Sequence, residues 1–488
     1  MNLLVLNALL GLCILSFPHY LPCELMEEEM SISSGQADYD GQTITLEGDV
    51  SVHYGLGKIS ARHLTVFPSE QRGRFSYFEI KDTILIELQG GGQLRCEKAE
   101  IDYSLMKGSF LGNDDFPDVI YENNENASSL SIKSKKMETE LIRLPLPGNL
   151  GLKTTVKEFL AQGLVHIHFK KMDLSQSEYL LTADQASYTP LRNVTNKSHS
   201  GLIVLTSNDS NHCFLTNADG DRIQARRIEF NTLDRGAFLF EAKGTLKGMD
   251  FEADEVFLNE KNQCMTLKGH IKIQEENLKI DTDHEVVIHQ KILDGKKNIS
   301  SLNSLKETNL IYLNKNKEII HKIICPGNLL IDHENTITTL ESLKDEKGHV
   351  IDEKQVFFED EAGDMYADRV SINYKLKEKK WIPSAIFLEG RVQILNRFDG
   401  HVKESGTVLQ QALADKVNYN PDSQEILLTA IEGNRVLVFD KVNRVQMSAP
   451  ALRIRKEVKG RKNSIQGIGD VRFTFTEEMS KEVLSNVK

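Results

Sequence analysis

Aromatic residues are few in this sequence, and its basic residues are outnumbered by acidic ones, 59 to 71. One tryptophan occurs among 488 residues, and aromatic residues make up 7% of the chain. Proteins that bind single-stranded nucleic acid stack bases on aromatic side chains, so this scarcity argues against that class. The formal net charge of −12 argues against nucleic acid as a partner, because phosphates are neutralised by clustered lysine and arginine. The same acidity means that a phosphorylated lipid would be held mainly through its acyl chains.

Cysteine is also sparse, with six residues in the whole chain. Four of them lie far apart and without any Cys-x-x-Cys spacing: Cys96, Cys213, Cys264 and Cys325. This pattern is neither that of a disulfide scaffold nor that of a zinc site. Four cysteines allow three pairings, and all three stay open.

Long hydrophobic runs are lacking beyond residues 3–17. That run is short for a membrane-spanning helix, which needs about 20 apolar residues. Its position fits the core of a signal peptide, although no lysine or arginine precedes it. We therefore expect residues 1–23 to be a signal peptide, with an uncleaved N-terminal anchor as the alternative. Lipidation at Cys23 is disfavoured because Pro22 stands where a small residue should.

Apolar and polar residues alternate through most of the remaining chain, most clearly over Gln36–Phe67. Four aliphatic residues in this stretch occupy even positions: Ile44, Leu46, Val50 and Val52. Such alternation is typical of strands with one buried face. Gly48 inside the run indicates a bulge or bend. Between Ala61 and Leu64 the apolar phase shifts by one residue, which predicts a corner where the chain passes from one sheet to another.

Two short patterns from this stretch recur along the chain. The first, Gly-x-aliphatic-x-apolar, begins again at Gly163, Gly269, Gly327, Gly390 and Gly469. The second, Ala-x-x-aliphatic-x-apolar, begins again at Ala225, Ala253, Ala367, Ala414 and Ala449. Residues 267–273 and 388–394 repeat the pattern of residues 46–52 most fully. Several copies in one order predict a repeat architecture of stacked strand pairs.

The segments LEGDVSV (46–52) and ISARHLTV (59–66) resemble the OstA-like family of Gram-negative lipopolysaccharide-transport proteins. The likeness is clearest at 36–67, 223–290, 365–395 and 411–475. The resemblance implies a periplasmic location, with association with the inner or outer membrane possible. It also implies passage of lipopolysaccharide or lipooligosaccharide along an apolar trough. The chain is longer than the family's small bridge protein, which favours a free-standing bridge or scaffold of several blocks.

The patterns predict an all-β fold in which stacked antiparallel strand pairs form an open, twisted jelly roll or V-shaped β-solenoid. We expect one repeat block at 30–290, with insertions near 112–135 and 189–211, and a second at 321–476. Residues 291–320 are expected to link the blocks, and 477–488 to form a polar tail. Gly90–Gly92 predicts a hairpin turn, and Thr154–Gln162 is the best helix candidate.

Three groups of polar residues invite a catalytic or metal-binding reading. His166 and His168 share one strand face, but they alternate with apolar residues and so should point to solvent, with no third ligand nearby. Asp281, Asp283 and His284 have no nucleophile in a recognisable elbow, so a solvated turn is favoured. A third group, the aspartate that follows the repeated alanine (Asp254, Asp368 and Asp415), is expected to stabilise a turn at a strand corner. We therefore predict no enzyme activity, no catalytic residue, no metal and no cofactor.

The expected function is lipid binding in a trough between two sheets, which needs no catalytic residue because each buried methylene contributes ~0.8 kcal/mol. The predicted lining residues are Ile44, Leu46, Val50, Val52, Val165, Ile167, Leu267, Ile271, Ile273, Leu388, Val392 and Ile394. The alternative is a closed β-solenoid that serves as a structural or interaction protein of the cell envelope without lipid. A carbohydrate-acting β-helix comes third, because no convincing carboxylate pair is present.

The ends of such a stack expose unpaired backbone groups. The first repeat, near Ala37–Val52, has no proline and few charges, so we expect its edge to dock other OstA-like envelope proteins by strand pairing. Alternatively, Glu27–Glu29 fold back over this edge. At the other end, charged residues of 477–482 are expected to cover the last strand.

Overall fold

In the computed structural model all secondary structure of the described residues is β, which confirms the predicted fold class. The structure describes residues 30–54, 56–68, 75–88, 91–125, 128–145, 152–171, 178–190, 201–208, 211–293, 296–314, 316–360, 363–377, 380–396, 410–441, 444–455 and 464–475. The expected leader, the acidic run Glu27–Glu29 and the tail at 477–488 lie outside these residues.

The chain divides into two compact units, which are described separately. Unit 1 comprises residues 1–165 and 187–199, and unit 2 comprises residues 166–186 and 200–488. The strands of unit 1 are β1 (Ser31–Ser33), β2 (Gln36–Tyr39), β3 (Ile44–Tyr54), β4 (Gly57–Pro68), β5 (Phe75–Leu88), β6 (Gln93–Asp102), β7 (Lys107–Leu111), β8 (Val119–Glu125), β9 (Ser128–Ser134) and β10 (Lys136–Pro145). Two further strands contribute to both units: β11 (Leu152–Lys171) and β12 (Glu178–Pro190).

The strand β3 explains how unit 1 is built. Its first part, Ile44–Glu47, pairs with β2. Its second part, Val50–Tyr54, pairs with β1 through residues 51–53. Gly48 and Asp49 between them both have positive φ, 67° and 45°, and together they lie opposite a single residue of β4. This irregularity turns the strand, so that β3 contributes one segment to each of two walls of the unit.

The same traverse recurs along the chain, and we call each one a rung: a segment in one wall, a corner, and a segment in the other wall. In β4 the corner falls at Arg62, between Ala61 and Leu64, which are both buried. The corner predicted from the shift in apolar phase is therefore confirmed. In β5 the corner is formed by Asp82 and Thr83, which again have positive φ.

Unit 2 continues with strands that are paired in the same manner. They are β13 (Gly201–Thr206), β14 (Cys213–Asn217), β15 (Arg222–Ala225), β16 (Arg227–Asn231), β17 (Gly236–Leu246), β18 (Met249–Asn259), β19 (Cys264–Lys268), β20 (Ile271–Glu275), β21 (Leu278–Thr282), β22 (Val286–Leu293), β23 (Lys296–Ser304), β24 (Thr308–Leu313), β25 (Ile319–Cys325), β26 (Leu329–Asp332), β27 (Ile337–Glu341), β28 (Val356–Asp360), β29 (Gly363–Ala367), β30 (Arg369–Lys377), β31 (Lys380–Asn396), β32 (Gln410–Asn420), β33 (Glu425–Thr429), β34 (Val436–Asp440), β35 (Val445–Ala449), β36 (Ala451–Arg455), β37 (Ser464–Ile468) and β38 (Arg472–Phe475).

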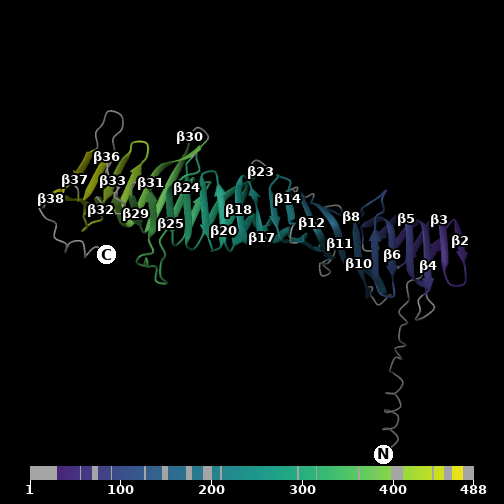
Figure 1. The fold of residues 1–488 in the computed structure, drawn as a ribbon. Helices are drawn as coiled ribbons and strands as arrows, with labels where there is room; N and C mark the ends of the chain where they lie inside the picture. Colours follow the sequence, from purple (N-terminus) through teal and green to yellow (C-terminus); the bar gives the residue numbers. More distant parts are fainter. Residues whose placement is uncertain are drawn as a thin grey trace, which may run out of the picture. The chain divides into compact units, whose positions relative to one another are not determined.

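Between β18 and β31 the two walls of unit 2 are separate, and their pairings form a closed circuit of 14 strands. The first wall runs β19–β22–β23–β26–β27–β30, and the second runs β20–β21–β24–β25–β28–β29. The chain forms a hairpin in one wall, passes a corner, and forms the next hairpin in the other wall. Figure 1 shows these strands following one another from teal to green. The corners consequently line one side of the interior, and the hairpin turns form the free edges of the walls on the other side.

The helix expected over Thr154–Gln162 is wrong, because these residues belong to β11. The pairing with β10 shifts between Glu140 and Leu141, which leaves Lys157 as an extra residue on β11. The bulge puts Val156 and Phe159, three positions apart, on the same buried face. A three-residue spacing of apolar residues is the mark of a helix face, and here a β-bulge produces it.

Three segments expected to be irregular also contain paired strands. Residues 112–135 hold the β8–β9 hairpin, whose first strand pairs with β6. Within 189–211, β13 pairs with β16. The expected linker at 291–320 holds β23 and β24 and parts of their neighbours, all within unit 2. The expected hairpin turn before β6 is confirmed by hydrogen bonds from Leu88 N to Gly92 O and from Gly91 N to Leu88 O.

Candidate functional site

The residues predicted to line a trough lie on the inner faces of the walls. Ten of the twelve are buried, each with 4% exposure or less: Leu46, Val50, Val52, Val165, Ile167, Leu267, Ile271, Ile273, Leu388 and Val392. Ile44 and Ile394 are half-buried. Each corner divides a repeat between the walls, as Leu267 of β19 and Ile271 of β20 illustrate. The alternation therefore sorts inner from outer positions at these residues.

Side chains from both walls fill much of the interior. In unit 1, Tyr121 of β8 meets Phe159 of β11 with ring centroids 4.7 Å apart. In unit 2, Phe169 of β11 and Phe230 of β16 lie 5.5 Å apart. At these places the described residues form a packed core rather than the wide trough expected from the sequence.

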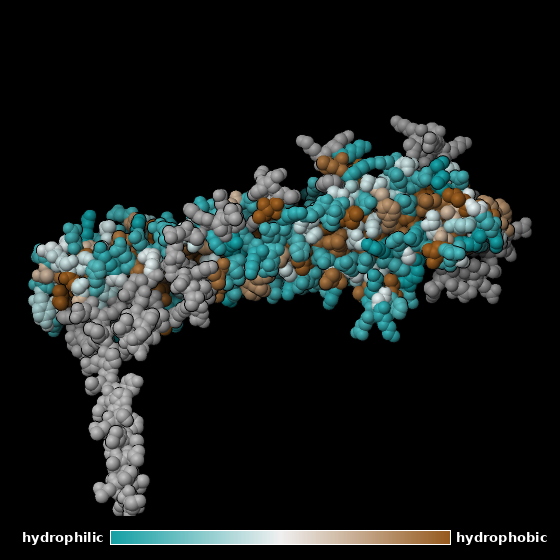
Figure 2. Space-filling view, turned by 180° about the vertical axis from the view of Figure 1, so that it is seen from behind, coloured by the Kyte–Doolittle hydropathy of each residue, from teal (hydrophilic) through white to brown (hydrophobic). Residues whose placement is uncertain are grey.

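Inner residues become more accessible toward the last strands of unit 2. The half-buried ones there are Ile386, Ile394, Tyr419, Ile426, Val438 and Ile454. On the last two strands, Ile465, Phe473 and Phe475 are 50%, 54% and 75% exposed. Figure 2 shows brown, apolar patches among polar surface on the visible face toward this end of the chain. Inner side chains on these strands are therefore covered less completely than those farther back in unit 2.

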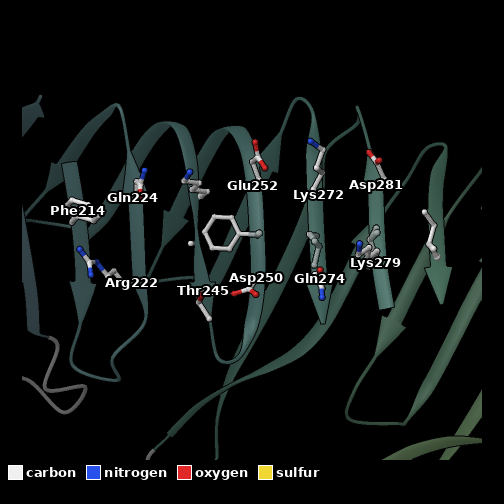
Figure 3. Close-up of a pocket in the computed structure, with 16 residues that line it drawn as sticks. Phe214, Arg222, Gln224, Thr245, Asp250, Glu252, Lys272, Gln274, Lys279 and Asp281 are labelled. Atoms are coloured by element: carbon white, nitrogen blue, oxygen red, sulfur yellow. Dashed lines mark hydrogen bonds between the residues drawn. The ribbon is translucent and has the colours of Figure 1, made fainter. Parts of the chain in front are cut away.

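A polar depression of about 940 Å³ lies in unit 2 over β14, β15, β17, β18, β20, β21 and β24 (Figure 3). Its charged lining residues are Arg222, Lys243, Asp250, Glu252, Lys272, Lys279 and Asp281. These alternate along their strands with buried residues such as Ile273 and Ile280, so they belong to the outer face of the second wall.

Charges of opposite sign face each other across the strands of this depression. Lys243 lies opposite Glu252, and Lys272 lies opposite both Glu252 and Asp281. Cross-strand pairs of this kind stabilise a sheet. Thr245 Oγ1 donates to Asp250 Oδ1 at 2.6 Å. The four basic and three acidic side chains nearly balance, and the cross-strand pairing accounts for their arrangement.

The histidines and aspartates considered as catalytic or metal-binding candidates lie on outer strand faces or in corners. His166 and His168 alternate with buried residues on β11 and face outward, and His168 Nε2 lies 2.7 Å from Glu178 Oε1. Asp281 lies on the outer face of β21. His284 N donates to Thr282 Oγ1 at 3.1 Å in the following corner. Within the described ranges, no cluster of histidine, cysteine and carboxylate side chains is suited to hold a metal ion.

The repeated aspartates stabilise corners, as predicted. Asp254 Oδ2 lies 2.7 Å from His270 Nδ1. Asp368 accepts from Arg391 Nη2 at 2.9 Å, and Asp415 accepts from the Ile431 backbone N–H at 2.8 Å. Each carboxylate thus ties one rung to a neighbouring one.

The four described cysteines carry free thiols. Cys96, Cys213 and Cys325 are buried and Cys264 is half-buried. Burial raises the pKa of the Cys325 thiol to about 11, and it also raises the pKa of Cys264. Thiolates are the reactive form of cysteine, so these environments do not activate a nucleophile.

Sequence reasoning missed the tyrosines that connect the walls at their free edges. Tyr179 of β12 donates from its hydroxyl to Glu260 Oε2 at 2.7 Å. Tyr312 and Tyr374 place their hydroxyl oxygens 3.3 Å apart. Both contacts join residues that are far apart in the sequence. The only sequence signal was a tyrosine on the apolar face of an alternating strand, which marks the tyrosine but does not identify its partner.

Comparison with known proteins finds no matching family model and no matching curated protein. Among the described residues, no helix is long and apolar enough to span a membrane.

Proposed function

We propose that this chain is a non-enzymatic, periplasmic, lipid-binding bridge or scaffold in lipopolysaccharide transport to the outer membrane. Its cargo would be lipopolysaccharide or lipooligosaccharide, held by the acyl chains between the two walls. The proposal takes its ligand and location from the OstA-like resemblance of residues 46–66 and the other repeat copies.

One observation carries the proposal: the chain joins the walls at the corners, while the contacts described between their free edges are hydrogen bonds and ion pairs that involve side chains. In the β18–β31 section every passage between the walls is a corner. Walls connected on one side can separate on the other, and their inner faces are aliphatic. An acyl chain inserted between them would gain ~0.8 kcal/mol per buried methylene, against the packing that it displaces.

Photo-crosslinking from paired positions tests the proposal. Crosslinkers replace the inner residues Val50, Ile271 and Val392 or, as matched controls, their outward-facing neighbours Ser51, Lys272 and Gln393. We expect the inner set to capture lipopolysaccharide and the control set to remain unlabelled. Equal capture by both sets would contradict binding between the walls.

The second candidate is a closed structural or interaction protein without lipid. It is favoured by the completeness of the packing, since Val52, Leu267 and Ile271 are all 0% exposed. Native mass spectrometry of the purified mature protein separates the two candidates. Bound lipid supports the first, and a single lipid-free mass from protein extracted under mild conditions supports the second.

A further inference from the structure

The free edges of the walls are bridged by polar contacts that involve tyrosine. In unit 1 the Leu56 backbone N–H, in the turn after β3, donates to the Tyr103 hydroxyl, in the turn after β6, at 3.3 Å. In unit 2 the Tyr312–Tyr374 contact joins β24 of the second wall to β30 of the first. The third bridge, at Tyr179, adds an ion pair to the tyrosine contact.

Tyr179 and its partners come from opposite walls of unit 2. Tyr179 lies at the start of β12 and pairs with Asn217 of β14, in the second wall. Glu260 and Arg235 lie in the turns after β18 and β16, at the free edge of the first wall. Arg235 Nε is 3.4 Å from Glu260 Oε2, the oxygen that also accepts the tyrosine hydroxyl.

These three polar groups are withdrawn from water although they lie at an edge. The side chains of Glu260 and Arg235 are 7% and 16% exposed, and Tyr179 is 8% exposed. The Tyr179 ring packs against Phe230 with centroids 5.3 Å apart. Burial and the neighbouring Glu260 carboxylate raise the pKa of Tyr179, so its hydroxyl keeps the proton that it donates.

A hollow of about 60 Å³ lies between the walls directly behind this contact. Its apolar lining includes Leu215 and Ile223 from the second wall and Phe230, Leu258 and Met265 from the first. Tyr179, Arg235 and Glu260 line the same hollow. It is therefore an apolar space whose polar boundary includes the residues that bridge the walls.

Separation of the walls here must break the Tyr179–Glu260 hydrogen bond, because the chain makes no covalent link on this side. A hydrogen bond to a charged group contributes more than one between neutral groups. Opening also returns the tyrosine hydroxyl and the ion pair to water, which offsets part of the loss. The bridge thus opposes separation of the walls at this place.

We propose that Tyr179, Glu260 and Arg235 form a clasp that holds the walls of unit 2 closed and controls insertion of an acyl chain at the free edge. That the ligand is an acyl chain rests on the proposed function, whereas closure of the walls by the clasp does not. The test therefore measures closure and ligand insertion separately.

The test compares the full-length protein with its Tyr179→Phe and Glu260→Gln variants. Hydrogen exchange of a peptide that contains the turn residues 260–263, which carry the Glu260 side of the contact, reports loosening of the free edge. The rate of fluorescence gain with parinaric acid, a fluorescent fatty acid, reports insertion. Loss of one charge-assisted hydrogen bond is expected to speed both readouts roughly tenfold. Tyr179→Phe keeps the ring against Phe230 and decides the outcome if Glu260→Gln fails to fold.

Matched controls remove equivalent groups from the outer faces of unit 2. Tyr366→Phe removes a hydroxyl beside Phe357, and Glu229→Gln removes the partner of Arg227, 2.6 Å away. Both controls should behave as the unaltered chain does. Unchanged exchange in the two clasp variants would overturn the clasp, whatever the lipid result. Faster exchange without any parinaric acid binding would support closure by the clasp and overturn the proposed lipid function.

Discussion

At the scale of single residues, several corners are formed by two consecutive residues with positive φ. Such pairs occur at Gly48–Asp49, Gly163–Leu164, Gly269–His270 and Gly390–Arg391. Glycine adopts this conformation without the steric penalty that a Cβ brings. Backbone geometry therefore explains the repeated glycine at these four corners.

Gly390→Ala should destabilise the protein more than Gly248→Ala does. Both glycines have positive φ, 75° and 85°, so each alanine costs about 1–2 kcal/mol from the backbone alone. A Cβ at Gly390 would also lie 2.5 Å from Asp368 Oδ2, whereas nothing lies within 4 Å at Gly248. The measurement is the apparent melting temperature of each variant. Equal losses would mean that the close approach at the corner has no energetic weight.

His270 should titrate above the usual histidine range. Its hydrogen bond with Asp254 and the charge of that carboxylate raise the pKa of His270. A raised pKa in the folded state means that protonated His270 stabilises the corner below the unfolded pKa of about 6.5, and that this contribution disappears as the pH rises through the folded pKa. NMR titration of the His270 ring should show the raised value, and Asp254→Asn should lower it. An unchanged pKa in that variant would exclude Asp254 as the cause.

At the scale of elements, the bulge in β11 determines which side chains face inward. Deletion of Lys157 should remove the extra residue and turn Val156 or Phe159 away from the core, because a one-residue slip reverses the faces of a strand. We expect the apparent melting temperature to fall by several degrees. Lys157→Ala keeps the bulge and loses only an exposed ion pair with Glu140, 2.6 Å away, which contributes little because solvent screens it. If deletion of Lys157 lowers the apparent melting temperature no more than Lys157→Ala does, this account of the bulge is contradicted.

Alternation predicted strands well where it was regular, as in β3 and β4, and it also located the corner between them. It failed at β11, because a bulge imitates the spacing of a helix. It failed again at β8 and β9, whose polar residues Glu122, Ser129 and Ser131 alternate with buried ones. Polar side chains on an outer face look like a loop when only composition is considered.

The inner positions were predictable from the sequence, while the contacts between walls were not. Val50 and Ile271 follow from the period of the strand. Tyr179 and Glu260 are 81 residues apart, and they meet only because of how the hairpins alternate between walls. A single sequence contains no local signal for such a pair.

At the scale of the whole molecule, the ends of the walls are the places where further strands can add. At the N-terminal end the outermost described strands are β1 and β2, and each pairs with β3 on one side. The first edge is therefore formed by Ser31–Tyr39 rather than by β3 itself, which corrects the boundary expected from the sequence. At the C-terminal end the last described strands are β37 and β38.

Proline substitutions in β2 test docking at the N-terminal edge. Neighbouring N–H groups of a strand point in opposite directions. One of the two substitutions Ala37→Pro and Asp38→Pro therefore removes a hydrogen-bond donor that faces β3, and the other removes a donor on the outer side. The variant that loses the outer donor should remain folded by circular dichroism and should capture an OstA-like partner less well in a pull-down. Undiminished capture by both folded variants would show that docking takes place elsewhere.

The reversal of direction from one rung to the next has a consequence for how such a chain can change its length. After the gain or loss of two successive rungs, the backbone continues in the same wall and in the same direction. After the gain or loss of a single rung, its direction is reversed. Evolution can therefore lengthen or shorten a section in steps of roughly 9–10 Å, the spacing of two strand intervals. Each step leaves the cross-section intact, because a rung depends chiefly on its immediate neighbours. The number of rungs can then change while the pattern of inner and outer side chains is inherited unchanged.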